Sequence, residues 1–90
     1  MVHLGTLSGI GLLSFNATHC GEVQYRFDVY RGRYAMSGSG ALTWDSMVVS
    51  AIQDGEYQLQ LQSGEKMNIE ILRPDGDGAT MLFSGTVPGF

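Results

Sequence analysis

Residues 22–30 read EVQYRFDVY, and apolar and polar side chains alternate along this stretch. Val23, Tyr25, Phe27 and Val29 fall on one face, and charged or amide residues fall on the other. Such alternation is typical of a β-strand with one buried and one solvated face. The Arg-Gly pair at 31–32 then indicates a turn, so residues 33–42 are predicted to return as a neighbouring antiparallel strand.

Further strands are predicted on both sides of this hairpin. Upstream, residues 4–16 form a long, mostly apolar stretch interrupted by Gly5, Gly9 and Gly11, and such glycines let a strand bend from one layer of a barrel into another. Downstream, residues 56–62, 66–73 and 79–87 alternate, and they are separated by Ser-Gly at 63–64 and by PDGDG at 74–78. These short connections predict antiparallel neighbours.

The period changes between the two groups of strands. Trp44, Val48, Ala51 and Ile52 recur at helical spacing, and Asp45 suits the position that caps a helix N-terminus. A short helix is therefore predicted at about residues 44–53.

These elements predict a single domain spanning residues 1–90. Its class is mainly β, on the border of α+β, with the order β-β-β-α-β-β-β. One short helix cannot cover six strands, so the sheet must bury a face on itself. We therefore expect an antiparallel barrel or sandwich of six to seven strands, with the helix at one open end.

The composition is that of a small folded protein with an acidic balance. Apolar residues make up 43% of the 90 residues and the net charge is −4, which excludes the disordered class. Residues 1–42 carry three arginines against two acids, whereas residues 43–90 carry two basic residues against seven acids. The acidic balance argues against binding to nucleic acid or to anionic membranes. The longest apolar runs are too short to span a bilayer, and we expect a cytoplasmic protein.

Catalytic and metal-binding patterns are weak in this sequence. His19 and Cys20 are adjacent in a predicted turn at residues 16–21, where neighbouring side chains diverge, and His3 lies close to the N-terminus. Asp75 and Asp77 resemble the opening of a calcium loop, but no acidic residue follows Asp77 to complete it. We expect no enzyme activity, no metal and no cofactor.

Protein contact is the functional class that the sequence favours. The first predicted strand carries apolar residues on both faces, which requires either internal burial or a partner. Tyrosines and arginines gather around the turn that follows the second strand. The sequence therefore predicts a non-enzymatic module that either binds another protein or associates with itself as a homo-oligomer. Its predicted surface is Leu4, Leu7, Ile10, Leu12, Tyr30, Arg31, Arg33 and Tyr34.

Two alternatives stay open at this point. The net charge of residues 43–90 is −5, and their acidic residues include Glu56, Glu65, Asp75 and Asp77. This charge suits an acidic inhibitor that occupies a basic site on another protein, for example a nucleic-acid enzyme. A small apolar-ligand carrier, gated by a helix at residues 44–52, is the other. The identity of a partner or ligand does not follow from the sequence.

Overall fold

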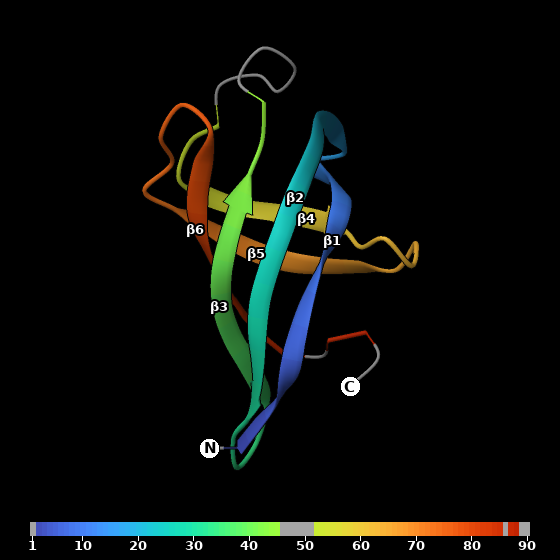
Figure 1. Ribbon diagram of the computed structural model, residues 1–90, viewed down its shortest axis with the longest axis vertical. Helices are drawn as coiled ribbons and strands as arrows, with labels where there is room; N and C mark the ends of the chain where they lie inside the picture. Colours follow the sequence, from blue (N-terminus) through green and yellow to red (C-terminus); the bar gives the residue numbers. More distant parts are fainter. Residues whose placement is uncertain (1, 46–51, 86, 89–90) are drawn as a thin grey trace.

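The computed structural model describes residues 2–45, 52–85 and 87–88, which form a closed antiparallel barrel (Figure 1). The order around the barrel is β1-β2-β3-β6-β5-β4, and β4 returns to pair with β1. The mainly β, antiparallel barrel is as predicted, but a seventh strand is not found in the part of the chain that the structure describes. The strands are β1 (Val2–Phe15), β2 (Thr18–Arg31), β3 (Met36–Thr43), β4 (Gly55–Gln60), β5 (Lys66–Leu72) and β6 (Gly78–Ser84).

The barrel consists of two groups of strands that cross each other. In Figure 1, β1, β2, β3 and β6 follow the long dimension of the molecule, and β4 and β5 run across them. The groups join at two short seams, where β1 pairs with β4 and β5 pairs with β6. At the first seam Leu12, Leu13 and Ser14 pair with Gln60, Leu59 and Gln58, and at the second Glu70, Ile71 and Leu72 pair with Leu82, Met81 and Thr80.

Apolar side chains from all six strands fill the interior. The alternation predicted for β2 is confirmed, since Val23, Phe27 and Val29 are buried between exposed or half-buried neighbours. The rings of Phe27 and Phe83 meet edge to face with centroids 5.1 Å apart, an arrangement that aromatic quadrupoles favour. Among the described residues no polar or charged side chain is buried. Polar chemistry is therefore confined to the outer faces and the turns.

The turn between β1 and β2 is shorter than predicted. Asn16 and Ala17 both have positive φ, 52° and 64°, as a two-residue type I′ hairpin turn requires. His19 and Cys20 therefore lie in β2 and not in a six-residue turn. Ser14 pairs with His19 and Leu13 with Gly21, so Cys20 is an extra, bulged residue.

Two glycines let β3 lie close against its neighbours. A Cβ atom on Gly40 would collide with the carbonyl oxygen of Arg26, and one on Gly38 would collide with the carbonyl oxygen of Asp28 and the ring of Phe83. The pairing of β2 with β3 runs without a shift from Gln24 to Arg31. These glycines therefore permit close strand approach, and no bulge interrupts this pairing.

The predicted helix at residues 44–53 has no support in the described residues. Residues 46–51 lie outside them, and Trp44, Asp45, Ile52 and Gln53 on either side are not helical. The backbone N–H of Trp44 donates a 2.8 Å hydrogen bond to the carbonyl of Asp77, and its indole Nε1–H donates a 3.2 Å bond to the carbonyl of Gly76. Tertiary bonds to the β5–β6 turn thus hold Trp44, which the helical spacing could not indicate.

The last predicted strand ends earlier than the sequence pattern suggests. β6 stops at Ser84, and Gly85 follows with a φ of +106° and an N–H bonded to the carbonyl of Met36. Residues 87–88, the next that the structure describes, are not in a strand. Val87 is fully buried in the core cluster, so this segment contributes to the core without being a strand.

Candidate interaction surfaces

The predicted apolar surface on β1 is divided between the core and the outside. Ile10 and Leu12 lie on the outer face and are 48% and 38% exposed. Leu4 and Leu7, by contrast, are partly buried and pack against the core. Leu7 lies on the inward parity of β1, opposite to Ile10 and Leu12. The extra residue between His3, which pairs with Tyr30, and Gly5, which pairs with Val29, reverses the alternation and turns Leu4 inward as well.

One edge of β1 has no strand partner over most of its length. Among the described strands, β1 meets β4 only at residues 12–14, although it pairs with β2 from Val2 to Phe15. The N–H of Ile10 points away from β2 and donates a 3.2 Å hydrogen bond to Oε1 of Gln62. Because backbone groups alternate along a strand, the N–H groups of Thr6 and Ser8 point the same way. We call residues 2–9 on this side the β1 edge.

A shallow hollow lies on the outer face of the barrel over β1, β2 and β3, across β1 from its free edge. Its volume is about 380 Å³, and Ile10 and Arg26 lie at its border. The surrounding residues on β3 are small, which leaves space above the sheet. The lining residues are Ser8, Gly9, Ile10, Gln24, Tyr25, Arg26, Ala41 and Thr43.

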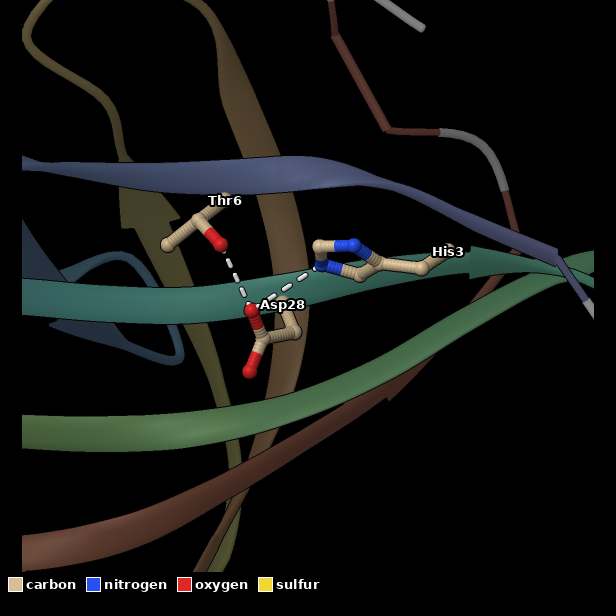
Figure 2. A network of polar contacts seen from close by, with 3 residues as sticks. All are labelled: His3, Thr6 and Asp28. Atoms are coloured by element: carbon tan, nitrogen blue, oxygen red, sulfur yellow. Dashed lines mark hydrogen bonds and ion pairs between the residues drawn. The ribbon is translucent and has the colours of Figure 1, made fainter.

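The N-terminal end of β1 is fixed to β2 by a small polar network (Figure 2). The hydroxyl of Thr6 donates a 2.6 Å hydrogen bond to Oδ1 of Asp28, and Nε2 of His3 lies 3.2 Å from the same oxygen. These bonds, that of Thr6 first, hold the pKa of Asp28 below its ordinary value. The ring of His3 also packs on Tyr30, with centroids 5.1 Å apart. The network orders the strand that carries the free edge.

The turn between β2 and β3 presents two arginines at one end of the molecule (Figure 1). Arg31, Arg33 and Tyr34 are exposed, Tyr34 to 92%, and we call these three residues the arginine tip. The N–H of Gly32 bonds to the carbonyl of Ala35 and closes the turn. Within the described residues neither arginine forms an ion pair. Tyr30, predicted with this group, is half-buried against His3 instead.

A larger hollow lies on the outside of β4, β5 and β6. Its volume is about 560 Å³, and its lining combines two glutamates and other polar residues with apolar and aromatic ones but includes no basic residue. Glu56 and Glu70 are direct cross-strand partners inside it. We call this hollow the acidic groove; it is lined by Ser14, Asn16, Glu56, Tyr57, Gln58, Asn68, Ile69, Glu70, Leu82, Phe83 and Ser84.

The acidic groove was not recognised from the sequence. The sequence predicts Glu56 as one of four acidic contact residues, but it does not single out Glu70. The other three, Glu65, Asp75 and Asp77, lie in exposed turns and do not line the groove. The alternation of polar residues within 56–60 and 66–70 predicts a polar outer face on both strands. The strand register, which places Glu56 opposite Glu70, does not follow from that alternation.

His3 lies in β1, whereas His19 and Cys20 lie in β2. Partial burial raises the pKa of the Cys20 thiol, which disfavours the reactive thiolate. No three His, Cys, Asp or Glu side chains gather as a metal site among residues 2–45, 52–85 and 87–88. The described part of the chain also contains no helix long and apolar enough to cross a membrane.

Comparison of the chain with protein-family models, with curated proteins and with solved structures found no match.

Proposed function

We propose that this protein is a non-enzymatic interaction module that binds an extended segment of a partner protein along the β1 edge. The observation that carries the proposal is the pairing of β1, which has β2 along one side but β4 along only residues 12–14 of the other. An edge with unpaired backbone groups is a template for one more strand. Several peptide-binding domains recruit their ligands in this way.

The surroundings of the edge suit an added strand. The outward N–H groups of Thr6 and Ser8 supply donors for a new ladder, and no charged side chain or proline interrupts residues 5–9. The hollow beside Ile10 offers space for an apolar side chain of the incoming segment. Main-chain bonds would give affinity, and this hollow would give preference for particular side chains.

Small-ligand transport receives less support as a function. Inward side chains, among them the fully buried Phe27, Leu59 and Met81, pack together in one cluster. Six-stranded barrels fall below the size at which an interior holds a ligand. Both hollows described above lie on the outer faces. We therefore place binding at the surface of the barrel.

A random peptide library displayed on phage, selected against the purified protein, tests this proposal. Selected peptides should bind the Ser8→Pro variant at least about tenfold more weakly, because proline removes an outward N–H donor. The ladder with β2 should survive, since the N–H of Ser8 points away from it. Ser8→Ala keeps the N–H group and serves as the matched control. A library that yields no binders, or binders that tolerate Ser8→Pro, would refute binding at this edge.

A further inference from the structure

Two glutamate carboxylates face each other across β4 and β5 in the acidic groove. Glu56 on β4 lies directly opposite Glu70 on β5, and cross-strand partners have Cβ atoms about 5 Å apart. Like charges in such a pair repel and weaken the sheet. Within the described residues no lysine or arginine forms an ion pair with either glutamate. The fold keeps this unfavourable pair in a hollow that has space for another group.

The arginine tip carries the opposite charge in a compact form. Arg31 and Arg33 are separated by one residue, and residues 29–44 contain no acidic residue. Both side chains are exposed, and the β2–β3 hairpin turn beside them lies at one end of the molecule (Figure 1). The tip thus presents two guanidinium groups, which match carboxylates in a bidentate manner.

We propose that the arginine tip of one copy docks into the acidic groove of a second copy. Two arginines would meet two glutamates, and the amides of Gln58 and Asn68 beside them would accept or donate further hydrogen bonds. The groove volume of about 560 Å³ lies within the range of about 300–1,000 Å³ that takes a drug-sized ligand. It therefore has space for the side chains of one turn.

The arrangement of the two surfaces makes the contact intermolecular. The tip lies at one end of a molecule 40 Å long, whereas β4 and β5 cross its other half (Figure 1). The tip of a rigid barrel cannot reach its own groove. Because the two surfaces differ, each copy can bind one neighbour through its tip and another through its groove. Such contacts build rings or open chains when the tip and the groove engage different neighbours, and a two-fold dimer when two copies exchange them.

This inference uses surfaces other than the β1 edge and goes beyond the proposed function. It predicts that sedimentation velocity of the full chain at low salt shows species larger than 9.8 kDa that grow with concentration. Added salt should dissociate these assemblies, because it screens the exposed charges that form the contact. Arg31→Gln with Arg33→Gln should reduce the association constant at least about tenfold, as should Glu56→Gln with Glu70→Gln.

Mixing the two double variants provides the sharpest measurement. The tip variant keeps a working groove, and the groove variant keeps a working tip, so the mixture should form one contact and stop at a dimer. Glu22→Gln with Glu65→Gln makes the same change in charge at exposed positions outside the groove and should still assemble. Lys66→Gln with Arg73→Gln serves in the same way as the control for the tip. Circular dichroism confirms that each variant is folded.

Several outcomes would overturn the proposal. A wild-type protein that stays monomeric at low salt has no such contact, even if its groove binds a basic peptide or another basic protein. Assemblies that persist in both double variants are held together elsewhere. The Ser8→Pro variant separates this test from that of the β1 edge, because it should lose the selected peptides and still assemble.

Discussion

The hydroxyl of Thr6 donates a 2.6 Å hydrogen bond to Oδ1 of Asp28, its direct cross-strand partner. The bond joins β1 to β2 within the part of β1 whose other edge is free. It stabilises the ionised carboxylate, so the pKa of Asp28 in the folded protein lies below its ordinary value of 3.8. The position of the β1 edge therefore depends in part on this charged acceptor.

The first prediction concerns the titration of Asp28. Thr6→Val should raise the pKa of Asp28 toward 3.8, as followed by NMR titration of the carboxyl carbon. With a lowered pKa in the folded state, the stabilisation by Asp28 is complete above 3.8 and is lost as the pH falls through the folded value. Urea unfolding of Thr6→Val should thus depend less on pH below 3.8. An unchanged pKa in the variant would remove the role given to Thr6.

The second prediction concerns Gly40 on β3. Gly40→Ala should lower the free energy of unfolding by about 1–3 kcal/mol, because the added methyl group collides with the backbone of Arg26 and Phe27 on β2. Gly76→Ala is the control, since nothing lies within 4 Å of a Cβ atom there, and it should change stability by less than about 0.5 kcal/mol. Urea unfolding followed by circular dichroism measures both. Equal effects at the two positions would contradict close strand approach at Gly40.

The third prediction concerns Trp44, which lies where a helix was expected. Trp44→Phe should destabilise the protein by at least about 1 kcal/mol, because it removes the hydrogen bond from Nε1 to the carbonyl of Gly76 and some buried surface. The amide of Trp44 should remain slow in hydrogen exchange, since its bond to the carbonyl of Asp77 involves only the backbone. A variant as stable as the wild type would show that the indole bond contributes nothing.

The strands were predictable because their pattern is local, whereas their pairing is not. The period-two alternation of residues 22–30 and 66–71 follows from one buried face and needs no knowledge of the neighbour. The contact between Leu12 and Gln60, which closes the barrel, joins residues that are distant in the sequence. The bulge at Leu4 shifts the register by one residue, and a shift of that size moves side chains to the opposite face.

The strand pairing that forms the acidic groove, at the β4–β5 hairpin, could not be predicted from the local pattern either. A two-residue turn at Ser63 and Gly64 would place Glu56 opposite Ile71. The observed turn is longer, with hydrogen bonds from Leu61 to Glu65 and from Gly64 to Leu61, and it places Glu56 opposite Glu70. The arginine tip needed no such information, because Arg31 ends β2 and Arg33 lies in the turn that directly follows.

The fourth prediction concerns the stability cost of the glutamate pair. Glu70→Gln should raise the free energy of unfolding by about 0.2–1 kcal/mol, because it relieves repulsion from Glu56 across the strands. The gain should shrink in high salt, which screens exposed charges. Glu65→Gln, in the exposed turn, is the control and should have little effect. A loss of stability in Glu70→Gln would mean that the pair is not repulsive in the folded protein.

The fifth prediction concerns the reactivity of Cys20. Its thiol is half-buried in the bulge of β2, where its sulfur lies 3.8 Å from the carbonyl oxygen of Thr18, and burial raises its pKa. Because the thiolate is the nucleophile, iodoacetamide at pH 7.5 should alkylate folded Cys20 more slowly than a free small-molecule thiol. In urea the rate should rise to that of the free thiol, which serves as the internal reference. A rate in the folded state above this reference would indicate an activated cysteine and would support a catalytic role for Cys20.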